Sequence, residues 1–358
     1  MRFELPEELE MLRSVVSDFA QSELASGAVE RDANGRFDRS VFNQMAELGL
    51  TGIPVPEMYG GAGVGWLTYV VVMEELAKVC ASSASVLAAH TAGVVWPLFH
   101  YGDEAVREEL LVPLASGAKL AGTGVTGRKA TSLLGTHSFV LNAGVADGYL
   151  LFTEEQWGEG IQKPAVVWTQ PDPTVEVTTN LISKLGLRSF PTGELTLVPN
   201  AANLKKNIIV QGRRVSGMAR EIRTMLALSA AAQSVGIAQG ALEAAASYAK
   251  TRKQFGTPIG RQQGILFKLS DMSIATEASR LLVRQAAWQL DEHINSAAAS
   301  KQVKLAHTYA VRTATMVARE AVQIHGGYGY IEEYQVERML RDAMTLETAV
   351  GVGGLSKR

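Results

Sequence analysis

The segment QIHGGYGYIEEYQVERMLRDA, residues 323–343, carries the densest set of ligand-compatible features in the chain. Gly326, Gly327 and Gly329 permit close backbone approach to a ligand, and their amides can face phosphate or sugar oxygens. A loop between two helices is the alternative interpretation of the same glycines. We interpret His325 as a packed or hydrogen-bonded side chain rather than a base or metal ligand.

A second segment, TRKQFGTPIGRQQ (251–263), ends a long Ala- and Leu-rich helical pattern at Gly256 and Pro258. Arg252, Lys253 and Arg261 surround Phe255, a combination that suits the phosphates and base of a nucleotide. The alternative is a solvated helix end whose basic residues favour the helix dipole.

Composition excludes several classes of protein. The 358 residues carry a net charge of −2 and are 47% hydrophobic, which is typical of a soluble globular chain without a nucleic-acid surface. One cysteine, Cys80, excludes an internal disulfide framework, and no Cys/His spacing indicates a metal site. The start MRFELPEELEML lacks the apolar core of a signal peptide, and no run is long enough to predict a membrane span. We expect a cytoplasmic protein.

The pattern along the chain predicts a mainly α fold with a central β domain. Helical periodicity fills the first third, for example through Leu9, Leu12 and Val16. Short β-branched runs such as PAVVWTQ and GELTLV follow, and long helical patterns return from about residue 217. We predict an N-terminal helical domain (1–118), a shortened middle β domain (119–212) and a C-terminal helical bundle (213–358).

Together these segments resemble the acyl-CoA dehydrogenase family across nearly the whole chain. PEMYGGAG, LVPLASGAKLAG, GIAQGALEAAASYAKTRKQFG and the 323–343 segment match that family's motifs in the right order. The resemblance implies a three-domain architecture with a middle β-barrel-like domain and a C-terminal four-helix bundle. It also implies FAD-dependent α,β-oxidation of an acyl-CoA, in which a glutamate removes the α-proton while flavin N5 takes a hydride.

The resemblance assigns one half of an FAD site to intact motifs. The residues that match the adenosine and pyrophosphate side are Arg252, Phe255, Gly256, Gln262, Gln263, Gln323, Gly326 and Gly327. In the family these groups reach across a subunit interface, so the cofactor is expected to be shared between subunits.

The flavin half departs from the family. Where the family has TEPxAGSD, this chain has TGRKATS (126–132), which keeps only Thr126 and Ser132 as weaker cofactor-binding candidates. Where the family has VLNGxKxWITNxxxAD, the chain has VLNAGVAD (140–147). This alignment predicts that the strand carrying the flavin-covering Trp and Thr is deleted.

The base position also departs. Counting from the Arg-Asp-Ala triplet at 341–343 puts Val350 at the family's catalytic glutamate, so no catalytic residue is assigned there. Glu347 is a weaker carboxylate candidate three residues earlier. In relatives with the base on the long helix, the same position is Leu226, with Ala227 where an Arg often occurs, and Glu221 is more than a turn away.

Three hypotheses follow. The favoured one is a catalytically incomplete subunit that pairs with an active homologous subunit, as in the family's two-plus-two enzymes, some of which act on steroid side-chain CoA esters. The second is a non-catalytic homo-oligomeric scaffold or regulatory protein. The third is a self-sufficient acyl-CoA oxidoreductase that uses Glu347. The family usually passes electrons to an electron-transfer flavoprotein, which is therefore a further candidate partner.

Overall fold

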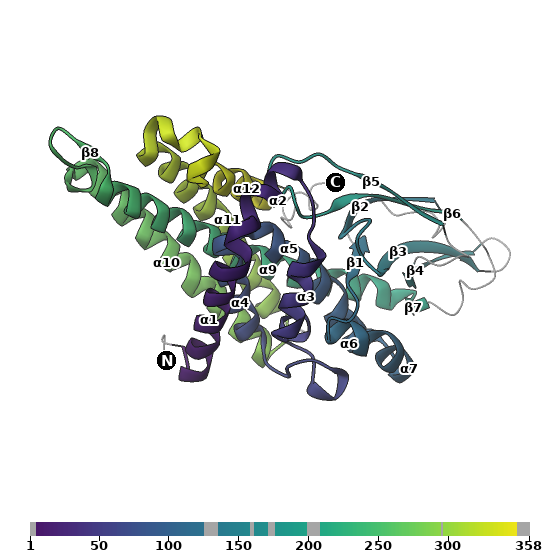
Figure 1. Ribbon diagram of the computed structural model, residues 1–358. Helices are drawn as coiled ribbons and strands as arrows, with labels where there is room; N and C mark the ends of the chain where they lie inside the picture. Colours follow the sequence, from purple (N-terminus) through teal and green to yellow (C-terminus); the bar gives the residue numbers. More distant parts are fainter. Residues whose placement is uncertain are drawn as a thin grey trace.

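The computed structural model describes residues 5–124, 135–157, 161–170, 176–198, 208–294 and 296–348. Helices occupy both ends of the described part of the chain, and one large sheet lies between them in sequence (Figure 1). The predicted fold class, mainly α with a central β domain, is confirmed.

The N-terminal part is a set of short helices. They are α1 (Glu7–Phe19), α2 (Ala25–Asn34), α3 (Arg39–Glu47), α4 (Trp66–Val79), α5 (Ala81–His90), α6 (Trp96–Tyr101), α7 (Glu104–Val106) and α8 (Val112–Ala115), with π-helical turns η1 (Ala20–Leu24), η4 (Thr91–Val95) and η5 (Arg107–Leu111). Local sequence explains several boundaries. The Asp38 carboxylate accepts from the Ser40 N–H at 2.9 Å and caps α3, and Gly35 ends α2 at φ 60°.

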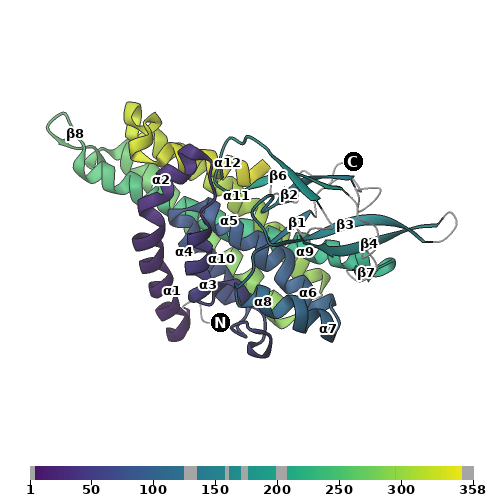
Figure 2. The ribbon, with the colours of Figure 1, turned by 45° about the vertical axis from the view of Figure 1, so that its right-hand side comes forward.

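Seven strands form one mixed sheet in the order β5-β6-β2-β1-β3-β4-β7. Their bounds are β1 (Ala121–Gly124), β2 (Gly135–Leu141), β3 (Gly148–Trp157), β4 (Ile161–Thr169), β5 (Glu176–Leu181), β6 (Thr192–Val198) and β7 (Ile208–Gln211). Only β1 and β3 pair in parallel, and the remaining neighbours are antiparallel. Figure 2 shows this sheet at one side of the helical body, with β7 leading into α9.

The C-terminal part is built on α9 (Arg213–Thr251), α10 (Gln263–Glu292), α11 (Ala297–His325) and α12 (Val336–Thr348), with 3₁₀ turns η7 (Ile259–Arg261), η8 (Gly326–Tyr330) and η9 (Glu332–Tyr334). Helix α9 is the central helix. It packs closely on α4 through two glycines. A Cβ on Gly236 would clash with the Glu74 carbonyl oxygen, and a Cβ on Gly240 would lie 2.6 Å from the Lys78 carbonyl oxygen.

Among the described residues, α9 is the one helix long and apolar enough to cross a membrane, but 89% of its apolar window is buried inside the molecule. We therefore interpret it as a core helix.

Polar contacts fix the sheet against the N-terminal helices. The Ala121 N–H donates to Nδ1 of buried His90 at 3.0 Å, while Nε2 of the same ring donates to the Leu114 carbonyl. The Asn142 amide donates to the Val86 and Ala121 carbonyls at 3.1 and 2.9 Å. Because these groups are fully buried, breaking any one of them leaves an unsatisfied polar atom in the core.

Candidate functional site

The C-terminal ends of α9 and α11 meet in an aromatic cluster. The Tyr248 ring stacks on the His325 ring at a centroid distance of 4.3 Å, and Tyr334 packs edge-on against both. One turn after Tyr248, the Arg252 guanidinium lies over the Tyr328 ring at 5.5 Å. The structure therefore brings Arg252 together with the Gly326–Tyr330 turn, although 74 or more residues separate them in sequence.

His325 has a packing role. Its Nδ1 donates to the Ala321 carbonyl at 2.7 Å, the ring is buried, and burial lowers the pKa of the imidazole below its usual value. The interpretation of His325 as a packed side chain is confirmed. Sequence analysis did not select Tyr248 or Tyr328. The one feature that could have indicated them is their position, since Tyr248 lies one helical turn before Arg252 and Tyr328 directly follows Gly327.

Beyond Arg252 the chain forms a hairpin of β8 (Lys253–Gln254) and β9 (Thr257–Pro258). The hairpin projects from the end of the long helices (Figure 1). At its tip the Phe255 side chain is 95% exposed, with φ 53°, and Gly256 has φ 82°. At this exposure the phenyl ring makes almost no contact within the chain, so it is available to a ligand or to another subunit.

The other predicted cofactor residues border this end of the bundle. Gln262 precedes and Gln263 begins α10, Gln323 lies in the last turn of α11, and a Cβ on Gly326 or Gly327 would meet nothing within 4 Å. An open backbone turn, a cation and an exposed ring fit the adenosine and pyrophosphate half of FAD. These residues would hold that half. Thr126 and Ser132 lie outside the described residues.

The predicted loss of the flavin-covering strand stays a prediction, because the structure describes a strand directly before Asn142 that a second alignment would assign to it. Strand β2 occupies Gly135–Leu141 and pairs with both β1 and β6, directly before the Asn142 turn. Read back from Asn142–Asp147, the pattern GxKxWITNxxxAD fits Gly135–Asp147 without a gap. Phe139 then stands at the Trp position and Leu141 at the Thr position. In this second alignment an aromatic side chain stands at the Trp position and an apolar one at the Thr position.

None of the carboxylates weighed as a base is both free and buried. The Glu347 side chain is exposed at the end of α12, and its Oε2 accepts from Thr315 Oγ1 at 2.7 Å. Leu226 is buried and apolar, close to the place where Gly93 and Thr123 meet. Val350 lies outside the described residues.

Glu221 accepts hydrogen bonds from three aromatic donors on α6. Its Oε1 accepts from Trp96 Nε1 and His100 Nδ1, both at 2.7 Å, and its Oε2 accepts from the Tyr101 hydroxyl at 2.9 Å. Burial alone would raise the pKa of this carboxyl, but the three hydrogen bonds outweigh burial and lower the pKa below its usual value. The bond to Glu221 raises the pKa of His100. A carboxylate stabilised in this way is a poor proton acceptor.

The Arg-Asp-Ala triplet joins three parts of the chain. Arg341 binds Asp32 of α2 at 2.6 Å, and buried Asp342 accepts from the Leu187 N–H in the loop between β5 and β6 at 2.6 Å. Thr345 Oγ1 accepts from the Gly186 N–H at 3.0 Å. These contacts fix α12, the helix that leads to position 350.

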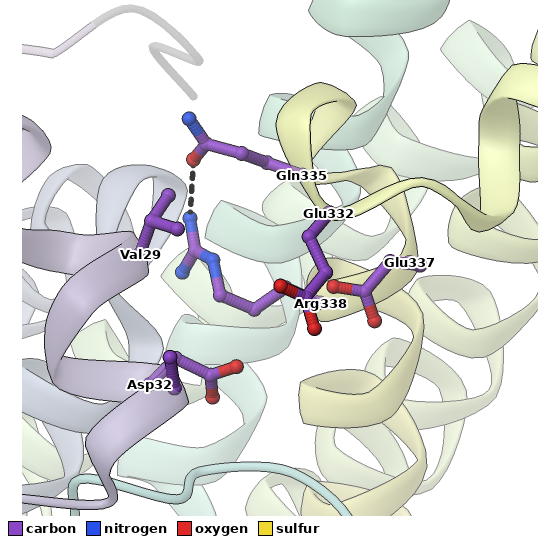
Figure 3. A pocket seen from close by; sticks show the side chains of 7 residues that line it. Val29, Asp32, Glu332, Gln335, Glu337 and Arg338 are labelled. Carbon is purple, nitrogen blue, oxygen red and sulfur yellow. Dashed lines mark hydrogen bonds between the residues drawn. The ribbon is translucent and has the colours of Figure 1, made fainter.

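A small polar pocket lies beside this junction, between α2 and α12. Figure 3 shows the carboxylates of Asp32, Glu332 and Glu337 around Arg338, whose guanidinium donates to Gln335 Oε1 at 2.9 Å. The described residues contain no group of three or more His, Cys, Asp or Glu side chains arranged to hold a metal ion. We interpret the pocket as part of the ionic junction.

Two family models match the chain: "Acyl-CoA dehydrogenase, N-terminal domain" at residues 6–118 and "Acyl-CoA dehydrogenase, C-terminal domain" at residues 218–355. A probable acyl-CoA dehydrogenase, YngJ, of Bacillus subtilis is 37% identical, with 100% of this chain and 98% of the relative covered. That alignment of 386 positions is longer than the chain, so the chain lacks residues that the relative has.

Two solved structures show the same architecture. Butyryl-CoA dehydrogenase from Megasphaera elsdenii superposes with a TM-score of 0.90 at 32% identity, covering 98% of this chain and 96% of that one. The prolyl acyl carrier protein oxidase AnaB superposes with a TM-score of 0.85 at 25% identity, covering 97% and 96%.

Proposed function

Because the chain belongs to the acyl-CoA dehydrogenase family, we propose that it is a subunit of an FAD-dependent enzyme that dehydrogenates an acyl thioester between its α and β carbons. Acyl-CoA is the substrate form for which the family is named. We propose further that this chain supplies the adenosine and pyrophosphate side of the FAD site and that a homologous, catalytically complete subunit supplies the base. FAD, when bound, accepts the hydride that leaves the β carbon.

The observation that carries this proposal is a contrast between two ends of the same fold. Arg252, Phe255 and the open Gly326–Gly327 turn form an exposed edge that fits a shared dinucleotide. At the family's two base positions the sequence has Val350 and Leu226, and neither side chain accepts a proton. Loss of a general base typically costs ~10²–10⁴-fold in rate.

The position of Phe139 refines the proposal. With β2 in place, the chain retains an aromatic side chain where the family covers the flavin, so we propose that it also contacts the isoalloxazine ring. The missing function is then proton removal, and flavin binding is retained.

The test is to purify the chain alone and with candidate homologous subunits from its native host, and to record the visible spectrum and the turnover of acyl thioesters. We expect yellow protein and turnover from the mixed complex, and no turnover from the single chain. Turnover by a homomer would contradict the proposal.

Glu347 provides the second candidate, a self-sufficient enzyme. Only one of its oxygens accepts a hydrogen bond from another described residue, so the other is free to accept a proton. Glu347→Gln decides between the two: it abolishes turnover if Glu347 is the base, and it leaves the mixed complex unchanged under the first proposal. A homomer that binds no flavin and acts on no thioester would indicate the non-catalytic scaffold.

A further inference from the structure

Positive charge is concentrated where the sheet joins the helical bundle. Between residues 205 and 223 the sequence has six cationic side chains and a single acidic one, in a chain whose net charge is −2. The acidic residue is Glu221, and its two oxygens are taken up by Trp96, His100 and Tyr101. The oxygens of that carboxylate are therefore not bonded to any of these cations.

Four of these cations lie on the first turns of α9 and define an arginine surface: Arg213, Arg214, Arg220 and Arg223. Arg213, Arg220 and Arg223 are spaced by seven and three residues, so they share one face of the helix over about 15 Å. Arg214 lies on the neighbouring face, with its guanidinium over the Tyr101 ring at 5.8 Å.

The arginine surface has no ion-pair partner within the described part of the chain. Arg213, Arg214 and Arg220 are exposed, and none of the four forms a salt bridge to a described carboxylate. Arg223 is half-buried, and burial together with the nearby Arg220 lowers the pKa of its guanidinium. Unpaired like charges at this density repel each other, so the surface favours a multivalent anionic partner.

The surface also lies next to a family base position on the same helix. It starts beside β7 at the edge of the sheet (Figure 2) and ends one turn before Leu226, the base position in some family members. There a Cβ on Gly93 would lie 2.8 Å from Thr123 Cγ2 and 4.0 Å from Leu226 Cδ2. The arginine surface and this closely packed position are therefore adjacent along α9.

We propose that the arginine surface docks an acidic carrier protein that presents the acyl thioester on a phosphopantetheine arm. The inference rests on the proposed function and names its carrier. Charges spread over about 15 Å of helix match an acidic helix of a protein, whereas the phosphates of CoA are clustered at one end of that molecule.

The test compares Arg213→Gln/Arg220→Gln with the control Lys301→Gln/Lys304→Gln, which removes two exposed cations from α11. The probes are a butyryl-loaded bacterial acyl carrier protein and butyryl-CoA, with Kd measured by fluorescence anisotropy at two salt concentrations. We expect the arginine variant to bind the carrier protein about three- to tenfold more weakly, the wild type to lose affinity at high salt, and the control to bind normally.

Three outcomes overturn the inference: no binding of the carrier protein by the wild type, an equal loss in the lysine control, or a loss confined to butyryl-CoA, which would identify the surface as a CoA phosphate site. Unchanged thermal unfolding of the arginine variant excludes misfolding as the cause. Binding is measured without turnover, so a failure of the proposed catalytic pairing is distinguished from a failure of docking.

Discussion

Replacing Glu221 by Ala tests whether this carboxylate holds α6 against α9. The change removes three hydrogen bonds at once and leaves the buried Trp96 indole N–H without an acceptor. An orphaned buried donor costs ~1–3 kcal/mol. His100 and Tyr101 are partly exposed and can turn to water, so each adds less. We expect a total loss of about 3 kcal/mol in the free energy of unfolding, and about 1 kcal/mol for Tyr101→Phe, which removes one donor.

The assay is urea unfolding at pH 7, followed by far-ultraviolet circular dichroism. Its pH dependence provides a second readout. The raised pKa of His100 means that its contribution is complete below the unfolded value of 6.5 and is lost as pH rises through the folded pKa. The lowered pKa of Glu221 means that its contribution is present above 4.5 and is lost as pH falls through the folded pKa. The wild type should exceed Glu221→Ala most between these limits. Equal stability of the two proteins at pH 7 would refute the reasoning.

Three further predictions concern other parts of the chain. Phe255→Ala should leave the melting temperature of the FAD-free protein unchanged, because the ring is 95% exposed. The same change should release FAD during gel filtration of the assembled enzyme. Met58→Ala, at a residue 76% exposed, is the control, and retained FAD in the Phe255 variant would contradict the role of Phe255. Gly186→Ala should destabilise the protein by ~1–3 kcal/mol in thermal unfolding, since the new Cβ would clash with the backbone of Arg341. Gly264→Ala is the control, because its Cβ would meet open space. Equal melting temperatures of the two variants would refute the junction at α12. Burial raises the pKa of Asp342 from 3.8 to about 6, so ionisation of this carboxyl destabilises the folded protein as pH rises between those values. The melting temperature of Asp342→Asn should therefore increase relative to that of the wild type over this pH range.

The sequence was sufficient to predict the helix–sheet–helix order, because that order depends on local patterns, while the FAD-facing edge stays a prediction. Arg252 and Gly326 belong to short motifs at helix ends, and the packing of α9 on α11 brings those ends together. The flavin wall could not be placed reliably from sequence. The letters VLN at 140–142 match one part of the family pattern, while Asn142–Asp147 match a later part equally well. Pairing of β2 with β1 and β6 places a strand directly before Asn142, which is compatible with the second register.

The Glu221 cluster was beyond sequence analysis for a different reason. Its partners lie at least 120 residues away, and nothing in a local window connects Trp96, His100 and Tyr101 with a carboxylate on α9. The residues beside Glu221 are Arg220 and Ile222, so the local sequence does not mark this carboxylate as buried.

An anaerobic titration of the FAD-loaded chain with an acyl thioester, followed through the flavin absorbance, tests the absence of a base most directly. The titration is then repeated after a homologous subunit with an intact catalytic glutamate is added. We predict that the absorbance of the chain alone stays constant, because no side chain at either base position takes the α-proton, and that it bleaches once the second subunit is present. Bleaching by the chain alone would contradict the central claim.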